Sequence, residues 1–252
     1  MKYVIFTCIA IAVFLTGCKF SASVDPNLID GDTTSASTTS STTNETQYDV
    51  QITNFTFNQK FSNASYIFHK NALSKEFTPG SAVKSSIEEL CEIGNNQKWL
   101  SDALLNTNVY TTRSGLETAS HTTSNATTVT ISATSDIYLT WGNMLVNTND
   151  GFTGLTHIQM NDLNVGESKI VDANAFDCGT EFNFETPSTM SGPHGDQSTI
   201  AKAVSAAAAT DEGFLSIHRG VITSSDGLAN SVLDHTHFFN NPVAQVKITR
   251  LK

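Results

Sequence analysis

From Tyr48 onward the chain alternates apolar and polar residues in short runs, a pattern typical of half-buried β-strands. Val50 and Ile52 begin the alternation, which changes phase near Asn54, before Phe55, and so predicts a bulge there. Runs rich in β-branched and aromatic residues follow at 128–131, 137–141, 214–218 and 244–249. The pattern predicts an all-β fold in the form of an antiparallel β-sandwich.

One short segment favours a helix instead. Ser85 and Glu88 have the spacing of a capping box, and Gly94 is placed to end the helix. The apolar face of this segment consists of Val83, Ile87, Leu90 and Cys91. We expect this one helix to cap the sandwich. The alanine run 206–209 lacks an apolar stripe and is expected to be a loop or a short helix.

The first residues have the pattern of a secretion signal. Lys2 precedes an apolar stretch of about a dozen residues, too short to span a bilayer. The stretch ends in the bacterial lipobox Leu15-Thr16-Gly17-Cys18, so we expect removal of residues 1–17 and acylation of Cys18, which anchors the protein to a membrane. An ordinary signal with an incidental cysteine is the alternative. Lys19 stands where inner-membrane lipoproteins of enterobacteria have Asp, which favours the outer membrane, with the domain periplasmic or surface-exposed.

Composition changes between the signal and the strands. Residues 18–47 are expected to form a flexible linker, because 21–46 is rich in Ser, Thr, Asp and Gly and has little apolar surface to offset the entropy of ordering. Residues 48–252 are expected to form one domain, since about 200 residues suffice for a single core.

The charge balance restricts the possible partners. The chain has 24 acidic and 14 basic residues and a formal net charge of −10. An acidic surface repels phosphate backbones and anionic lipids, so no nucleic-acid partner is expected. The same surface is compatible with a cation-binding protein.

Two cysteines remain in the mature domain. Cys8 leaves with the signal and Cys18 carries lipid, which leaves Cys91 and Cys178 in an oxidising compartment, where a disulfide between them is expected. The alternative is that both are buried as small apolar side chains. A metal pair is disfavoured because neither has a second Cys or His at ligand spacing.

Acidic residues and glycines occur together in two loops, 144–155 and 176–181. Asp150, Asp177 and Glu181 offer the hard oxygen atoms that Ca²⁺ prefers, and loops at one end of a β-sandwich can bring them together. Such residues are also ordinary turn formers, so local sequence alone leaves a plain turn open.

Several motifs in a fixed order resemble the spondin N-terminal domain family, across nearly the whole expected domain. They are 52–54, 77–80, 144–155, 176–181, 212–214, 241–244 and 248–250. The resemblance implies a C2-like antiparallel sandwich that binds Ca²⁺ through Asp150, Asp177 and Glu181. It also implies an extracellular recognition or adhesion module with a protein or glycan ligand, rather than an enzyme.

The match departs from the family at two positions. Cys178 stands where alanine is common, and Gly151 stands where animal members have a bulky aromatic residue. The integrin-type partners of animal members are therefore not expected here. A lipoprotein with a purely structural role and no metal is a further alternative.

A zinc-dependent hydrolase is the rival hypothesis. His235 and His237, two residues apart on an expected strand, would project to one face, with His218 as the other candidate strand histidine. Histidines that only hydrogen-bond loop carbonyls are commoner. Serine catalysis is disfavoured because the sequence has no Gly-x-Ser-x-Gly motif.

Aromatic residues are expected mainly in the core. Only Phe152, beside a glycine in a loop, is a candidate exposed contact, and the alternative is that its ring anchors the loop. The residues expected to be buried are Phe55, Phe57, Phe61, Phe68, Trp141, Phe214, Phe238 and Phe239.

Overall fold

A computed structural model describes residues 44–195 and 212–252 of the chain. The lipobox with Cys18, most of the expected linker and the alanine run 206–209 lie outside these residues. The first strand starts at Thr46, within the last residues of the expected linker. In the described ranges, no helix is both long and apolar enough to cross a membrane.

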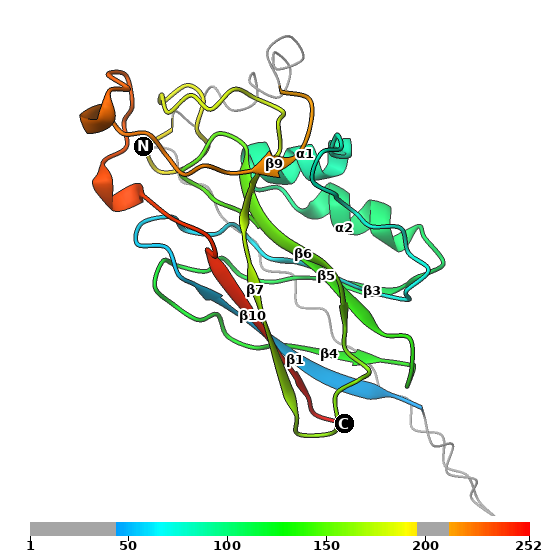
Figure 1. Cartoon of the computed structure of the whole chain (residues 1–252). Helices are drawn as coiled ribbons and strands as arrows, with labels where there is room; N and C mark the ends of the chain where they lie inside the picture. The colour runs from blue at the N-terminus through cyan, green and yellow to red at the C-terminus, as the bar shows by residue number, and fades with distance from the viewer. Residues whose placement is uncertain (1–43, 196–211) are drawn as a thin grey trace, which may run out of the picture. The chain divides into compact units, whose positions relative to one another are not determined.

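Two antiparallel sheets confirm the predicted all-β sandwich (Figure 1). The four-stranded sheet has the order β4-β1-β10-β7, formed by Thr127–Ile131, Thr46–Asn54, Ala244–Arg250 and Ser168–Ala173. The six-stranded sheet has the order β3-β2-β5-β6-β8-β9, formed by Val109–Ser114, Ser65–His69, Tyr138–Met144, Gly151–Gln159, Ala175–Asp177 and Ser216–Ile217. Sequence neighbours therefore pair within the larger sheet, while the first and last strands of the domain pair in the smaller one.

Strand β1 follows the alternation of the sequence. Buried and half-buried residues alternate along its whole length, and its pairing with β10 is regular from Tyr48 to Asn54. The expected bulge near Asn54 is therefore wrong. The strand ends there because the Asn54 Oδ1 atom accepts hydrogen bonds from the backbone N–H and the hydroxyl of Thr56, at 2.9 and 2.7 Å.

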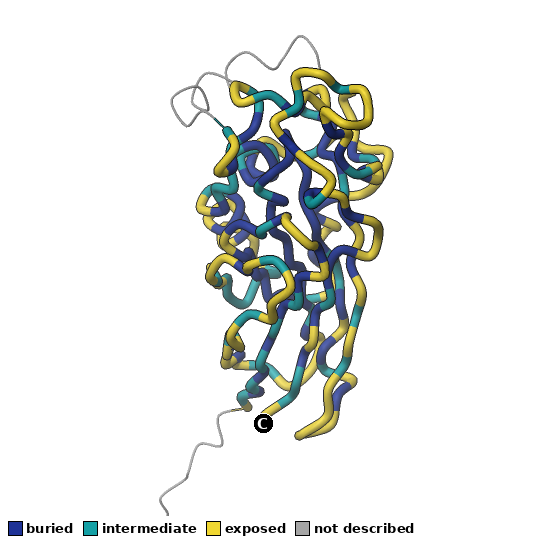
Figure 2. Tube along the Cα trace, turned by 90° about the vertical axis from the view of Figure 1, so that its left-hand side faces the viewer, coloured by how far each residue is buried: buried dark blue, intermediate teal, exposed yellow. Residues whose placement is uncertain are grey.

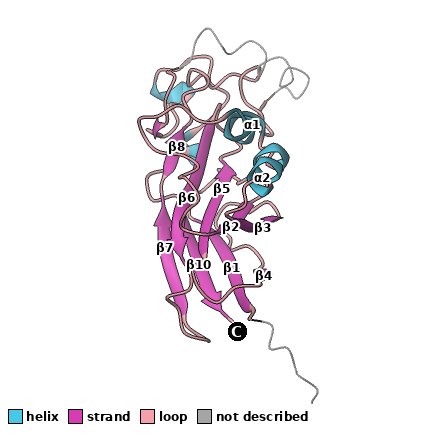
Figure 3. Cartoon of the chain, turned by 90° about the vertical axis from the view of Figure 1, so that its right-hand side faces the viewer, coloured by secondary structure: helices cyan, strands magenta, loops and turns pink. Residues whose placement is uncertain are grey.

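The six-stranded sheet is covered on both faces. All five residues of β2 are buried, as expected for a strand with apolar layers on either side. One layer fills the space between the sheets, with Val50, Ile52, Leu139, Trp141, Val246 and Ile248 among its members. Helices α1 (Ser85–Ile93) and α2 (Gln97–Leu104) contribute to the other layer (Figure 3), which includes Ile67, Ile87, Leu90, Trp99 and Phe152. The exposed positions are concentrated in the loops (Figure 2).

The predicted helix is present, with one correction and one addition. The residue that caps α1 is Lys84, without a side-chain cap, so the expected capping box of Ser85 and Glu88 does not form. Gly94 ends α1 with φ 69°, as expected. Helix α2 was not expected; it buries Trp99, Leu100 and Ala103 against the sheet.

Aromatic burial follows the sequence expectation only in part. Phe61, Phe68, Trp141 and Phe239 are buried, whereas Phe55, Phe57, Phe214 and Phe238 are exposed. The strand expected at 214–218 is reduced to the two residues of β9. The expectation that Phe152 is an exposed contact is wrong: it lies in β6, fully buried, with its ring 5.0 Å from that of Phe77 and 5.6 Å from that of Phe176.

Candidate functional site

The turn between β5 and β6 carries Asp150, the first predicted ligand. Thr148 closes this turn, because its hydroxyl donates to the Leu145 carbonyl at 2.6 Å and accepts from the Gly151 N–H at 3.0 Å. A Cβ atom built on Gly151 would lie 2.5 Å from the Thr148 Oγ1 atom and 3.0 Å from the His218 ring. A bulky residue at position 151 is therefore incompatible with this turn.

The Asp150 carboxylate connects this turn to the loop after β8. The side chain is fully buried, and its Oδ2 atom accepts from the backbone N–H groups of Thr180 and Glu181 at 2.8 and 3.1 Å. The Thr180 hydroxyl lies 3.2 Å from the same oxygen. The other oxygen, Oδ1, is buried without a hydrogen-bond partner among the described residues. Asp150 thus has one oxygen free to bind a ligand.

Burial and charge act together on Asp150. Burial and then the negative charge of Asp177 raise the pKa of its carboxyl to about 7, although the hydrogen bonds from Thr180 and Glu181 oppose the shift. The ionised form is therefore unfavourable near neutral pH unless a positive charge lies close by.

Asp177, the second predicted ligand, ends β8. Its Oδ1 atom accepts from the Gly179 N–H at 2.8 Å, and its Oδ2 atom accepts from the Asn183 side-chain amide. Gly179 has φ 67°, and a Cβ atom there would lie 2.3 Å from the Phe214 carbonyl oxygen, so this tight path requires glycine. Both oxygens of Asp177 already serve the loop, which makes it a weaker candidate ligand than Asp150.

Glu181, the third predicted ligand, lies beside a carboxyl group that the sequence did not single out. Burial raises the pKa of Glu181 to about 7. Glu92 of α1 is only 4% exposed, and neither of its oxygens accepts a hydrogen bond from the described residues. Burial, and then the charge of Glu181, raise the pKa of Glu92 to about 8. Glu92 therefore belongs to the same acidic cluster as Asp150 and Glu181.

A disulfide joins the two halves of this region. Cys91 of α1 is bonded to Cys178 in the loop after β8, with 6.4 Å between their Cα atoms. The residue after Cys91 is Glu92, and Glu181 lies three positions after Cys178. The pairing expected from the sequence was the signal that could have brought Glu92 to the site.

The candidate ligand atoms for a metal ion are all oxygens, but the three predicted acidic side chains do not surround a common point. Across 44–195 and 212–252, no three His, Cys, Asp or Glu side chains gather in a group that could hold a metal ion. Asp150, Asp177 and Glu181 therefore do not converge as expected. Among the described residues, the buried carboxylate and amide oxygens without hydrogen-bond partners are Asp150 Oδ1, Glu92 Oε1 and Oε2, and the Oδ1 atoms of Asn143, Asn147 and Asn149. Carboxylate and amide oxygens of this kind, completed by carbonyls and water, are ligands that Ca²⁺ accepts.

Asp177 also lines a cavity of about 440 Å³. Its lining combines charged groups, including Arg219 and Glu185, with the exposed aromatic ring of Phe214. His218 also lines it; burial lowers the pKa of this imidazole to about 4, so the ring is neutral, and its Nε2 atom has no hydrogen-bond partner among the described residues. This mixture is suited to a polar ligand with a face that can stack on an aromatic ring.

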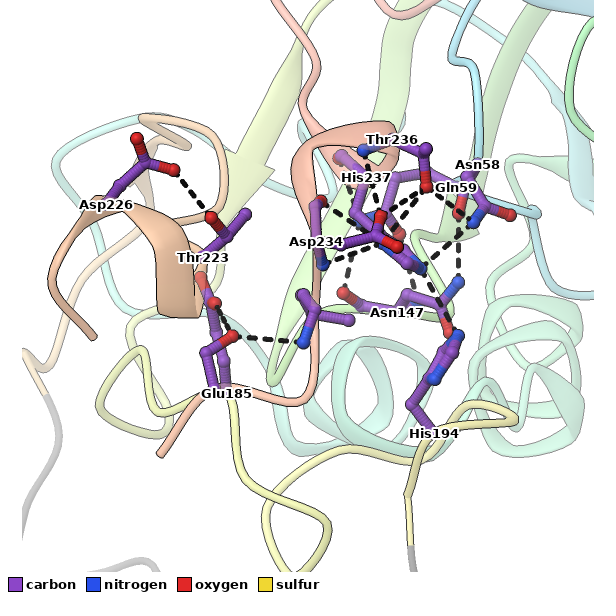
Figure 4. A network of polar contacts seen from close by, with 12 residues as sticks. Asn58, Gln59, Asn147, Glu185, His194, Thr223, Asp226, Asp234, Thr236 and His237 are labelled. Atoms are coloured by element: carbon purple, nitrogen blue, oxygen red, sulfur yellow. Dashed lines mark hydrogen bonds and ion pairs between the residues drawn. The ribbon is translucent and has the colours of Figure 1, made fainter. Parts of the chain in front are cut away.

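The histidines of the rival hypothesis are arranged differently from the expected strand. His235 and His237 lie in the 3₁₀-helix η3 (His235–His237), so the expected strand is wrong. His237 is 2% exposed whereas His235 is exposed, and the two side chains therefore do not share a face. The histidine whose ring faces that of His237 is instead His194, which lies in the loop after β8 (Figure 4).

No family model matches the chain, and no curated protein matches it either. The spondin resemblance therefore stays a prediction that depends on the motifs in the sequence.

Proposed function

We propose that the chain is a cell-envelope lipoprotein, anchored through lipid on Cys18, that presents a calcium-binding, spondin-like module to an extracellular protein or glycan. The proposal is for a binding protein rather than an enzyme. The single observation that carries it is the buried oxygen of Asp150 that lacks a partner, next to a second carboxyl, Glu92, with two such oxygens.

Buried carboxylates of this kind need a positive charge. Basic side chains do not supply it here, because the ion pairs of the described residues involve other carboxyl groups. A bound Ca²⁺ ion would neutralise Asp150 and Glu92 together and take further oxygens from Asn149, backbone carbonyls and water. It would join α1 to the β5–β6 turn, and so its main chemical contribution would be to fix the loop end of the sandwich.

The cavity beside Asp177 supports the recognition part of the proposal. Asp177 is close enough to Asp150 for its charge to raise the pKa of that carboxyl, and it also lines the cavity. A calcium ion bound at Asp150 would therefore lie near one of the residues that form the cavity wall. The exposed ring of Phe214 and the guanidinium of Arg219 are the groups that we expect to contact a glycan or a polar peptide there.

Calcium titration tests the proposal. The full chain, purified in detergent and stripped of metal, is titrated with CaCl₂ by calorimetry, alongside Asp150→Asn and Glu92→Gln. We expect one-to-one binding that both substitutions abolish, and a melting temperature that rises with calcium concentration by mass action.

The matched control is Asp172→Asn. Asp172 is an exposed carboxylate in β7 whose partner is Gln245, so this variant removes the same charge far from the candidate ligands. It should bind calcium as the unchanged protein does. Folded protein that binds no calcium, or that loses binding equally in Asp172→Asn, would overturn the assignment.

A further inference from the structure

Two imidazole rings meet at a second place, where the available ligand atoms are nitrogens rather than the oxygens of the acidic cluster. The Nε2 atoms of His194 and His237 lie 3.2 Å apart, and the ring planes are nearly perpendicular at 85°, with 4.9 Å between centroids (Figure 4). His194 comes from the loop after β8, and His237 ends η3. Residues 43 positions apart in the sequence thus point the same ring nitrogen at one another.

The second nitrogen of His237 has a carboxylate behind it. His237 Nδ1 lies 3.0 Å from Asp234 Oδ1, which also accepts from the Thr236 N–H at 2.9 Å. The Asp234 N–H also lies 3.3 Å from Nδ1, so the backbone and the side chain of Asp234 both hold this edge of the ring. These contacts turn the Nε2 edge of His237 toward His194.

Two imidazole nitrogens this close need a proton or a cation between them, because two lone pairs that face each other repel. Zinc–imidazole bonds are about 2.0–2.1 Å, and two ligands on a tetrahedral ion are then about 3.3–3.4 Å apart. The observed 3.2 Å separation of the two Nε2 atoms is close to this span. A histidine ligand whose other nitrogen donates to a carboxylate is also the usual arrangement in zinc sites.

We propose that His194 and His237 form a binding site for a divalent transition-metal ion of the zinc class, with Asp234 as the positioning carboxylate. Nitrogen ligands select Zn²⁺, Ni²⁺ and Cu²⁺ over Ca²⁺, so this site is separate from the oxygen cluster at Asp150. It takes His194 in place of His235, and it requires neither the strand nor the catalysis of the rival hypothesis.

The surroundings leave room for water ligands. His237 is buried, but His194 is exposed, so solvent reaches the shared side of the pair. The side-chain amide of Asn58, also exposed, donates to His237 Nε2 at 3.1 Å and to Thr236 Oγ1 at 3.1 Å. A bound ion displaces the first of these bonds, and the amide keeps the second.

The metal would add a connection between loops that hydrogen bonds already join. The Gln59 side chain donates to the His237 carbonyl at 3.4 Å and to the Asn147 carbonyl at 3.1 Å, which ties η3 to the β5–β6 turn (Figure 4). The Val232 N–H donates to the Glu185 carbonyl at 2.9 Å, and a metal on His194 would be a second link from the loop after β8 to the segment that carries η3. Binding should therefore stabilise this end of the domain without any change in the sheets.

Zinc titration of the full chain tests the proposal, with protein free of histidine tags and saturated with Ca²⁺ so that the oxygen cluster does not compete. Calorimetry with ZnCl₂ should show one site, and Co²⁺ should give the visible absorption of a site with nitrogen ligands. His194→Ala is the decisive variant, because an exposed loop residue can be replaced without loss of the fold. We expect it to weaken Zn²⁺ binding at least about tenfold, with an unchanged circular dichroism spectrum.

His235→Ala is the matched control, since it removes an exposed histidine from the same short helix and should bind Zn²⁺ as before. His237→Gln should also lose binding. The proposal is overturned if the unchanged protein binds Zn²⁺ no more tightly than His194→Ala, or if His235→Ala loses as much. It is equally overturned if histidine NMR resonances show only a proton shared by the pair and no shift with Zn²⁺.

Discussion

Cys91 and Cys178, which lie 87 residues apart in sequence, are bonded across the gap between α1 and the loop after β8. The bond fixes the helix that carries Glu92 against the loop that carries Glu181. It therefore sets the spacing of the acidic cluster as well as the stability of the domain.

Removal of this disulfide should destabilise the domain. A closed loop of 87 residues restricts the unfolded chain, and its release is expected to lower the free energy of unfolding by about 4 kcal/mol. Urea unfolding of the full chain with and without reductant measures the effect. Cys91→Ala with Cys178→Ala should show the lower stability in both conditions. If reductant leaves the urea midpoint of the unchanged protein where it was, the two thiols are not bonded in solution.

Calcium-free protein should lose stability as the pH rises from about 6.5 to 8.5. The folded-state pKa values of Asp150, Glu181 and Glu92 are raised, to about 7, 7 and 8, so the folded protein retains protons that the unfolded chain has released. The stability is complete below the unfolded pKa of each group and is lost as the pH passes through the folded pKa. For Glu92 alone the change is on the order of 1–2 kcal/mol.

The lowered pKa of His218, about 4, acts in the opposite direction but only at acidic pH, below the imidazole's ordinary value of 6.5. Denaturant midpoints measured between pH 6.5 and 8.5 therefore isolate the carboxyl groups. Glu92→Gln should flatten the pH dependence and stabilise the calcium-free protein at pH 8. A stability that rises across this window would contradict the raised pKa values.

Phe152→Ala should destabilise the domain by about 3–5 kcal/mol, because the ring is fully buried among Phe77 and Phe176 and its removal leaves a cavity. Phe57→Ala is the control, since this ring is 61% exposed, and its effect should stay within about 0.5 kcal/mol. Thermal unfolding of both variants makes the comparison. Equal melting temperatures for the two variants would contradict the burial of Phe152.

Cys18→Ser should release the protein from the membrane. The lipobox cysteine is the expected attachment point of the acyl chains, and serine cannot carry a thioether-linked lipid. Fractionation of cells and mass spectrometry of the purified N-terminus measure the change. The unchanged protein should be found in the membrane fraction with acyl mass on residue 18, and Lys19→Ala should remain there as a control.

The sandwich could be predicted because alternation is a local property of the chain. β1 and β10 show it over most of their length, and each buries one side of a regular pair. The residues 97–104 were missed because eight residues with three buried side chains give a weak helical period. Phe152 was misjudged because its neighbour Gly151 indicates a loop, whereas here glycine is required by the close approach of Thr148.

The site residues could be predicted only where the local sequence indicates a turn. Asp150 and Asp177 stand beside glycines in recognisable turns, and both are buried at the loop end. Glu92 gave no such signal, because an acidic residue on a short helix usually faces solvent. His194 lies in a loop between glycines and meets His237 only through tertiary structure. A contact between residues 43 positions apart cannot be predicted from local sequence patterns.

The chain enters β1 at Thr46, and β1 is hydrogen-bonded on both sides, to β4 and to β10. Tension that reaches Thr46 therefore pulls along the strand and shears two ladders at once, instead of opening them one bond at a time. The candidate sites lie beyond the opposite end of β1, and its nine extended residues span roughly 30 Å. Under the proposed anchorage through Cys18, a partner held at that end would load β1 along its length and shear both ladders together.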